Sequence, residues 1–355
     1  MTLAWSCGIV GLPNAGKSTL FKALTALDVT IESYPFSTID PNKAVVPLPD
    51  QRLGALAELC NSEIVTPATI EVYDVAGLVE GASRGEGLGN QFLGHLRDVD
   101  LLIHVVGGFE GAGEDIASPS SKIEIVNLEL NLADLEVISR RRQKVEPKLK
   151  SGEKGAKAEL ELLSRLEEHL NRGDPLRELE FSREEKMILD QLPLLTLKAM
   201  VYVYNLSEDN FLDPDVSVFP SNSPVIPMCA SLEAELADLP PEERGPFMEA
   251  YGIQKSRNEE LLQACYKHLG LATFYTVKGN EARAWVVPEN LPAVEAAGKV
   301  HSDMASGFIN VEVIGWHTLL EEGSLTKARD KGISRVEGKN YPVRDGEVLF
   351  FRFRD

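Results

Sequence analysis

Eight consecutive residues near the N-terminus have the spacing of a phosphate-binding loop. Gly11 to Ser18 reads GLPNAGKS and fits the pattern GxxxxGKS, between an apolar run and a stretch of helical character. Glycines let backbone amides turn inward around phosphates, and the helix N-terminus adds a partial positive charge. We expect Lys17 to reach the β- and γ-phosphates and the Ser18 hydroxyl to bind Mg²⁺. The loop residues Asn14, Ala15, Gly16 and Thr19 complete the predicted phosphate site.

A second motif favours a molecular switch over a kinase. Residues 74–77 read DVAG, a DxxG motif at the end of a predicted strand. We expect Asp74 to hold Mg²⁺ through water and the Gly77 amide to meet the γ-phosphate. A DxxG alone is an ordinary exit from a strand, but its pairing with the upstream loop favours the functional interpretation.

Thr38 lies between these two motifs, in the sequence YPFSTID. Its hydroxyl can bind Mg²⁺ and its amide can meet the γ-phosphate, in a loop that the triphosphate orders and hydrolysis releases. Ser37 offers the same groups, so the spacing leaves both residues open. The glycine-rich stretch 80–90 follows the DxxG motif and suits a second switch loop.

Two further residues bear on hydrolysis. Leu78 occupies the position where many switch GTPases place a glutamine that orients the attacking water. Leucine cannot hydrogen-bond, so either another group positions the water or intrinsic turnover is slow. Asn14 is a candidate ligand for K⁺, and a turn residue that stabilises the loop by its own side chain is an equal alternative.

The predicted base site departs from the guanine-specific pattern. Guanine-specific proteins carry NKxD after a later strand, whereas this chain has NLSE at residues 205–208. Glu208 is one methylene longer than Asp and crowds the guanine edge, while Leu206 keeps an apolar cover without an ammonium. A site that loses its guanine-pairing contact admits adenine, so we predict ATP in preference to GTP. The nucleotide contacts expected at this end are Asn205, Leu206, Glu208, Ala230 and Ser231.

Alternating strands and helices must position these motifs. Apolar runs typical of central parallel strands occur at 4–10, 69–75, 101–106, 197–204 and 225–228. Helical patterns occur at 18–26 and 259–269. The order of these elements predicts an α/β nucleotide-binding domain.

Two other parts of the chain have a different character. Residues 122–193 are rich in Glu, Lys, Arg and Leu, with leucines three or four positions apart, and predict a pair of long helices. Charged faces on ordinary domain helices are an equal alternative. After Gly270, short strands and glycine-rich turns predict a small β-rich domain. We therefore expect a nucleotide-binding domain over 1–121 and 194–271, a helical insertion over 122–193 and a C-terminal domain over 272–355.

The charge of the chain limits its partners. The 355 residues carry a net charge of −19, which argues against a protein that coats nucleic acid over its whole surface, and we expect no DNA partner. The helical insertion holds 14 basic and 16 acidic residues, and residues 272–355 hold 11 and 12. The acidity therefore sits on the α/β part, and an RNA or ribosome contact would use the other two parts. Four scattered cysteines, no signal peptide and no membrane-spanning run predict a cytoplasmic protein without a membrane partner.

Together, and in this order, the motifs resemble those of the YchF family of Obg-like ATPases. The resemblance rests on CGIVGLPNAGKSTLF from Cys7, YPFSTIDPN from Tyr34, DVAGLVEGASRGEGLGNQFL from Asp74 and NLSE from Asn205. In the C-terminal part, EGKNYPVRDGEVLFFRF from Glu337 is similar to a TGS domain. The resemblance covers nearly the whole chain.

This resemblance implies a P-loop NTPase with a Rossmann-like GTPase fold, a coiled-coil insertion and a β-rich, β-grasp-like TGS domain. It also implies a slow, Mg²⁺-dependent cytoplasmic ATPase that associates with ribosomes and stress responses. One feature departs from the family: relatives place a histidine in the loop after the strand ending near Val106, but residues 107–121 contain none. His95 and His104 lie nearby at positions that favour packing.

Alternative functions remain at this point. One is a GTP-dependent switch, and another is a nucleotide-gated adaptor that binds the ribosome or its RNA with negligible turnover. A P-loop kinase is disfavoured because DxxG and NLSE would be unexplained. The candidate RNA contacts in the C-terminal part are Lys299, His301, Lys327, Arg329 and Lys331.

Overall fold

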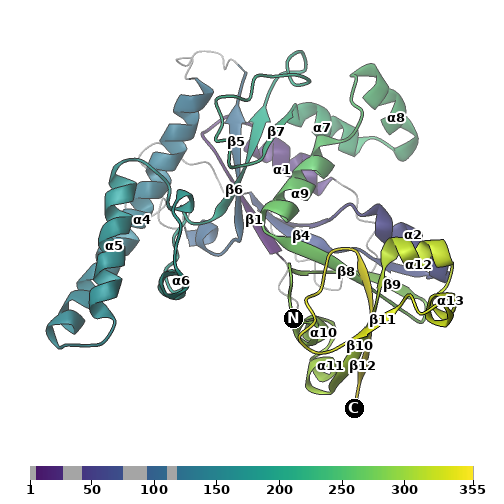
Figure 1. The fold of residues 1–355 in the computed structure, drawn as a ribbon. Helices are drawn as coiled ribbons and strands as arrows, with labels where there is room; N and C mark the ends of the chain where they lie inside the picture. Colours follow the sequence, from purple (N-terminus) through teal and green to yellow (C-terminus); the bar gives the residue numbers. More distant parts are fainter. Residues whose placement is uncertain (1–4, 27–41, 75–93, 110–117, 355) are drawn as a thin grey trace. The chain divides into compact units, whose positions relative to one another are not determined.

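A computed structural model of the chain describes residues 5–26, 42–74, 94–109 and 118–354 (Figure 1). The chain forms two compact units. The P-loop unit comprises Trp5–Ala44 and Glu71–Leu261, and the C-terminal unit joins Val45–Ile70 to the segment that begins at Leu262. Within these described ranges, no helix has the length and apolarity needed to cross a membrane.

A sheet in the order β2-β4-β1-β5-β6-β7 contains the strands of the P-loop unit, and β2 and the start of β4 include residues of the Val45–Ile70 segment. Strands β1, β5, β6 and β7 pair in parallel, and every residue of β5 is buried, so β5 is a central strand as its apolar sequence predicts. The predicted parallel strands and the P-loop α/β fold are confirmed. The strands are β1 (Trp5–Val10), β2 (Lys43–Pro47), β4 (Thr69–Asp74), β5 (Leu101–Gly107), β6 (Ala199–Asn205) and β7 (Val225–Met228).

Four helices that accompany this sheet are α1 (Lys17–Thr25), α7 (Ala230–Asp238), α8 (Pro241–Ala250) and α9 (Arg257–His268). Helices α1 and α7 pack together, and Lys22 forms an ion pair with Asp238 at 2.7 Å. Buried Glu233 of α7 accepts hydrogen bonds from the Ser256 hydroxyl at 2.7 Å and the Arg257 amide at 2.8 Å. The first backbone N–H groups of a helix have no acceptor within the helix itself. The Glu233 carboxylate supplies an acceptor at the start of α9.

The predicted pair of long helices is confirmed as a hairpin of α4 (Pro119–Lys150) and α5 (Ala156–Asn171). Helix α4 begins where Ser118 caps the Ser121 amide and a proline occupies the first turn, and both features favour a helix start. Its first half packs on the sheet through Ile123, Val126, Leu130 and Ala133. Its second half packs on α5, and Figure 1 shows the hairpin extending away from the sheet. The short elements Leu176–Glu178 and α6 (Arg183–Leu189) return the chain toward β6.

The C-terminal unit contains a second sheet, in the order β11-β10-β12-β8-β9-β3. Its strands are β3 (Ile64–Thr66), β8 (Leu271–Lys278), β9 (Glu281–Pro288), β10 (Phe308–Gly315), β11 (Arg335–Glu337) and β12 (Glu347–Phe353). The helices of its C-terminal segment are α10 (Ala293–Val300), α11 (Ser302–Ser306), α12 (Trp316–Glu322) and α13 (Leu325–Asp330). One face of the sheet has a core around Phe274, Val311 and Leu349, and the other has a core around Tyr275, Ile314 and Val348.

A segment from the N-terminal half completes this unit. Helix α2 (Gln51–Cys60) packs Leu53 and Leu56 into the core that contains Tyr275, and β3 pairs in parallel with β9. The expected domain boundaries assign residues 45–70 to the nucleotide-binding domain, whereas the structure groups them with the C-terminal segment. The physical reason is that the apolar face of α2 specifies burial but not its partner.

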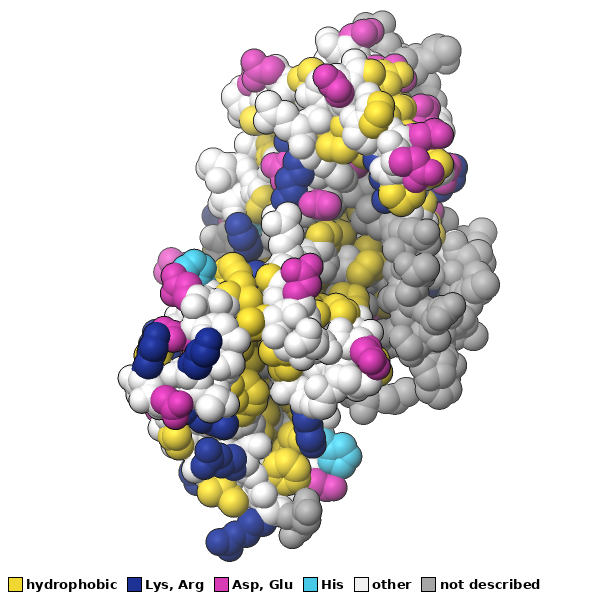
Figure 2. Space-filling model, turned by 90° about the vertical axis from the view of Figure 1, so that its right-hand side faces the viewer, with side chains coloured by type: hydrophobic (Ala, Val, Ile, Leu, Met, Phe, Trp, Pro, Cys, Tyr) yellow, Lys and Arg dark blue, Asp and Glu magenta, His cyan; other side chains and the backbone are white. Residues whose placement is uncertain are grey.

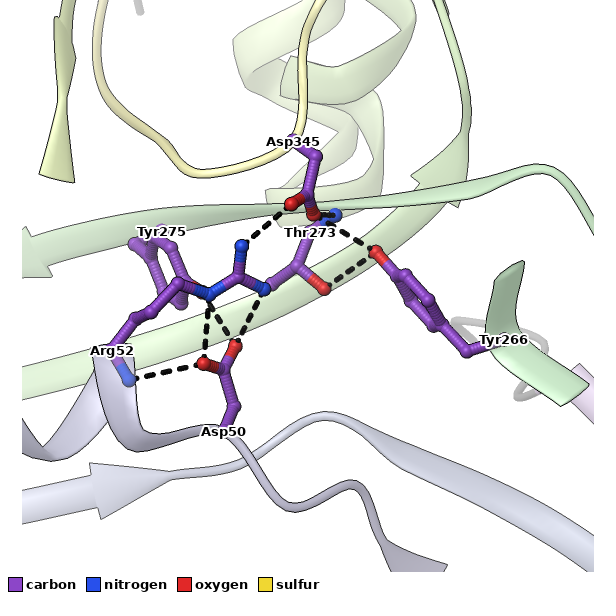
Figure 3. Close-up of polar contacts among 6 residues, drawn as sticks. All are labelled: Asp50, Arg52, Tyr266, Thr273, Tyr275 and Asp345. Carbon is purple, nitrogen blue, oxygen red and sulfur yellow. Dashed lines mark hydrogen bonds and ion pairs between the residues drawn. The ribbon is translucent and has the colours of Figure 1, made fainter. Parts of the chain in front are cut away.

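A polar network joins α2 to β8 and to the turn before β12 (Figure 3). Asp50 caps the Arg52 amide at 3.1 Å and also accepts hydrogen bonds from the Arg52 guanidinium and the Tyr275 hydroxyl. The other side of the Arg52 guanidinium pairs with Asp345 at 2.6 Å. Asp345 in turn accepts from the Thr273 amide at 2.8 Å. Burial, and then the Asp50 carboxylate, raise the pKa of Tyr275, so this phenol remains a donor at neutral pH.

We expect Leu56→Ala to destabilise the C-terminal unit by about 2–5 kcal/mol, because truncating a fully buried leucine removes apolar contacts and leaves a cavity. Urea unfolding of the full chain measures this loss. The matched control is Ile64→Ala, whose side chain is 47% exposed. Equal losses in the two variants would contradict the packing of α2 as a core element.

Candidate functional site

A cavity of about 730 Å³ opens in the P-loop unit where β1, β5 and β6 end. It is lined by Asn14, Gly16, Lys17, Ser18, Thr19, Phe109, Asn205, Leu206, Ser207, Glu208, Asp209 and Ser231. The carboxyl ends of parallel strands are the usual place for ligands in open α/β sheets. Two motifs nearly 200 residues apart in the sequence therefore line one cavity, whose size is ordinary for a small-molecule site.

The backbone of the phosphate loop has positive φ angles at glycine and asparagine, the residue types that adopt them most readily. Gly16 has φ +93°, and a Cβ at this position would lie 2.1 Å from the Asn205 side-chain nitrogen. At Gly11 a Cβ would lie 2.4 Å from the Val105 carbonyl oxygen. Asn14 has φ +59°, a left-handed conformation that asparagine adopts more readily than most residues. The loop therefore closes tightly against β5 and β6.

Lys17 is held inside the loop. Its ammonium donates to the Leu12 carbonyl at 2.7 Å, and the residue is buried. Burial lowers the pKa of Lys17, while the Asp74 carboxylate acts in the opposite direction. Burial thus disfavours the ammonium charge, and an anion placed in the cavity would stabilise it.

The carboxylate of Asp74, the last residue of β4, has an unsatisfied oxygen. Its Oδ1 is buried and has no hydrogen-bond partner in the described part of the chain. Ser18 presents an exposed hydroxyl to the cavity. Carboxylate, hydroxyl and water oxygens are the donors that Mg²⁺ prefers, so this donor set fits the predicted ion.

Asn205 joins the segments that form the cavity. Its side chain donates to the Ala15 carbonyl at 3.0 Å and accepts from the Ala230 amide at 3.0 Å. Its own carbonyl accepts from the Gly108 amide at 2.7 Å. Ala15 and Ala230 therefore reach the site through Asn205 rather than as part of the cavity wall. The carboxamide fixes the phosphate loop relative to the segment that begins α7.

The opposite end of the cavity combines an apolar wall with an exposed carboxylate. Leu206 is 6% exposed and packs with Phe211, Cys229 and Leu232. Glu208 is exposed at the cavity lining. Leu206 thus gives the cavity an apolar surface and Glu208 gives it an accessible carboxylate, and their contacts with a base stay a prediction.

Other predicted residues have different outcomes. Thr38, Gly77, Leu78 and the stretch 80–90 lie outside the described residues. Sequence reasoning missed Phe109, Ser207 and Asp209 as lining residues. Phe109 follows β5 directly, so the rule that sites form at strand ends would have identified it.

The two histidines near β5 differ in their surroundings. His104 is buried beside Tyr202, with ring centroids 5.3 Å apart, and neither ring nitrogen has a hydrogen-bond partner among the described residues. Burial, followed by the charges of Arg177 and Lys17, lowers the pKa of His104 to about 3. It is a neutral packing residue, as expected, whereas His95 is exposed on a helical stretch at 94–97.

We expect Asn205→Ala to weaken ATP binding at least about tenfold, because it leaves the Ala15 carbonyl and the Ala230 amide without their partner. Calorimetric titration with Mg-ATP measures the affinity. The control Asn210→Ala removes an exposed amide that donates to the Ser207 hydroxyl at 3.3 Å, and this variant should bind ATP normally. Normal binding by the Asn205 variant would show that the loop holds its shape without this bridge.

We expect His104→Phe to make the protein less sensitive to acid. The folded-state pKa of about 3 lies below the unfolded value of about 6.5, so the unfolded chain takes up a proton first as pH falls. Wild type should lose about 1.4 kcal/mol of unfolding free energy per pH unit from this residue between those two values. Urea unfolding of both proteins at several pH values measures the difference, and parallel pH profiles would refute the assignment.

Comparison with known proteins agrees with this geometry. A family model described as "50S ribosome-binding GTPase" matches residues 6–144. The model of the YchF-GTPase C-terminal domain, described as a "Protein of unknown function", matches residues 271–354.

Curated relatives match over their full length. The "Ribosome-binding ATPase YchF" of Bacillus subtilis (strain 168) is 43% identical over 99% of this chain and 100% of its own. The protein of the same description from Escherichia coli O157:H7 is 42% identical over 99% of both. The solved structure of the Schizosaccharomyces pombe YchF GTPase superposes with a TM-score of 0.87 at 30% identity, covering 98% of this chain and 97% of that one. The phosphate loop, the NLSE motif, the two matched domains and this full-length similarity lead to one conclusion: the chain belongs to the YchF family.

Proposed function

We propose that the protein binds ATP with Mg²⁺ in the cavity, hydrolyses it slowly to ADP and phosphate, and acts in the cytoplasm as a ribosome-associated switch. The observation that carries this proposal is the single cavity with a phosphate loop at one end and NLSE at the other. The relatives from B. subtilis and E. coli support it, since both are described as ribosome-binding ATPases.

The residues at the phosphate end have distinct proposed roles. Lys17 leaves the Leu12 carbonyl to pair with the β- and γ-phosphates, which replaces a neutral partner by a charged one. Ser18, Thr38 and Asp74 hold Mg²⁺, which neutralises charge that develops on the phosphate oxygens when bound. The Gly77 amide is the proposed donor to the γ-phosphate. Asn14 lines the same cavity as Lys17 and Ser18 and is the candidate K⁺ ligand.

The base end favours adenine in this proposal. Glu208 carries its carboxylate one methylene farther from the backbone than the aspartate of a guanine site. Leu206 is committed to the apolar cluster and supplies a wall without a charge. Because guanine loses its best discriminating contact, we expect GTP to bind more weakly than ATP.

Slow turnover follows from the groups near the γ-phosphate. Leu78 cannot orient a water, and His104 is enclosed with its ring neutral. The role of Lys17 and the backbone amides is therefore charge stabilisation, which acts without a strong general base.

We expect calorimetry on the nucleotide-free protein, with Mg²⁺ and K⁺ present, to give tighter binding of ATP than of GTP, and phosphate release to be slow but measurable. Lys17→Ala should reduce hydrolysis at least about 100-fold, since it removes the charge aimed at the transferred group. Lys22→Ala is the matched control on the same helix, because Lys22 is exposed and pairs with Asp238. Tighter GTP binding would make the protein a GTP-dependent switch. Equal phosphate release by wild type and Lys17→Ala would leave only a binding role.

A further inference from the structure

The far end of the helical hairpin is positively charged, although the protein as a whole is negatively charged. Residues 140–157, which we call the arm tip, contain eight basic and two acidic residues, a net charge of +6 in a chain whose net charge is −19. The segment spans the last turns of α4, the turn at 151–155 and the first residues of α5. The insertion is close to neutral as a whole only because its other parts are acidic.

The fold separates this charge from the acidic body of the P-loop unit. The last residue of α4 in the sheet core is Ala133, and the helix continues to Lys150, a further length of roughly 25 Å at 1.5 Å per residue. Figure 1 shows the α4–α5 turn at the end of the hairpin farthest from the sheet. That distance exceeds a Debye length at physiological salt, so the acidic residues of the body reduce the positive potential at the arm tip only weakly.

Three lysines of the arm tip have no acidic partner in the described part of the chain. Lys144, Lys150 and Lys154 are exposed and form no ion pair there. By contrast, Arg141 pairs with Glu159 at 2.6 Å, and Arg142 pairs with Glu167 at 2.9 Å. The arginines hold the two helices together, and the lysines are left for an external partner.

The basic residues expected to contact RNA in the C-terminal unit are mostly compensated. Arg329 pairs with buried Glu312 at 2.6 Å, and Lys331 pairs with Glu322 at 2.6 Å. His301 lies 3.4 Å from Asp303. In the lower part of Figure 2, Lys and Arg side chains lie among acidic and hydrophobic ones. Lys299, Lys327 and Lys339 form no ion pair in the described residues either, but residues 272–355 carry a net charge of −1, whereas the arm tip carries +6.

We propose that the arm tip binds the phosphate backbone of RNA, and that ribosomal RNA is its target. The tip contains no aromatic residue to stack on bases, so its contacts are electrostatic and independent of sequence. Lysine is depleted at protein–protein interfaces, which favours RNA over an acidic protein. The inference rests on the proposed ribosome association and identifies the surface that makes it.

The test compares two triple variants that remove the same charge. The tip variant is Lys144→Gln, Lys150→Gln and Lys154→Gln, and the control is Lys299→Gln, Lys327→Gln and Lys339→Gln in exposed positions of the C-terminal unit. Binding to a short fluorescent RNA hairpin is measured by anisotropy over a salt series, and binding to purified ribosomes by co-sedimentation. Mg-ATP affinity and thermal unfolding check that both variants are folded.

We expect the tip variant to bind the hairpin at least about tenfold more weakly and to lower the slope of log affinity against log salt by about 2 to 3, because three phosphate contacts are lost. Its co-sedimentation with ribosomes should fall in parallel, while the control stays close to wild type. Equal losses in both variants, or no wild-type binding to the hairpin, would overturn the proposal. Loss of ribosome binding with unchanged hairpin binding would overturn RNA in favour of an acidic ribosomal protein. If wild type binds the hairpin but not the ribosome, the ribosomal target and the proposed ribosome association fail, whereas loss of hairpin binding by the tip variant still supports the RNA contact.

Discussion

The carboxamide of Asn205 is the constraint on which the site depends. Asn205 is the last residue of β6, and its side chain hydrogen-bonds to Ala15 in the loop after β1 and to Ala230 after β7. Its main-chain carbonyl accepts a hydrogen bond from the Gly108 amide, after β5. Through its side chain and its main-chain carbonyl, this one residue thus links the segments that follow β1, β5 and β7 to the end of β6. The glycine at position 16 follows from this arrangement, since a Cβ there would overlap the carboxamide. The Asn205 carboxamide therefore supports the conformation of the phosphate loop from outside the loop itself.

The P-loop unit contains buried polar and charged groups that lower its free energy of unfolding. Lys17 is buried with a lowered pKa, so its charge costs folding free energy below the folded-state pKa. This cost falls as pH rises through that pKa and is gone above the ordinary lysine value of 10.5. Asp74 keeps a buried oxygen without a partner in the described chain, and His104 keeps two such nitrogens. Unsatisfied buried groups cost free energy, and of these three residues only Lys17 lines the cavity, so its cost is the one that an anion placed there would relieve.

Much of the fold and of the candidate site could be predicted because local patterns specify them. The phosphate loop needs its glycines, central strands need continuous apolar runs, and the hairpin needs leucines at helical spacing. The destination of α2 could not be predicted in this way, because Leu53 and Leu56 require an apolar surface and any apolar surface would satisfy the pattern. The role of Asn205 was assigned to the nucleotide, but its partners in the structure are backbone groups from segments distant in sequence. Phe109 was missed because a single phenylalanine carries no spacing signal, so that only its position after β5 marks it as a site residue.

The composition of the C-terminal unit also sets an order of events during synthesis. Helix α2 must wait for β8 and β9, which are encoded roughly 200 residues later and emerge some 10 to 40 s after it at about 5–20 residues per second. Strand β12, the last in the chain, lies inside the sheet between β10 and β8 rather than at an edge. The sheet therefore cannot close until β12 has been made. Until β8 and β9 are made, the apolar face of α2 lacks the core partners that Tyr275 and Ala284 supply, so the earliest-made part of this unit depends on later segments for its burial.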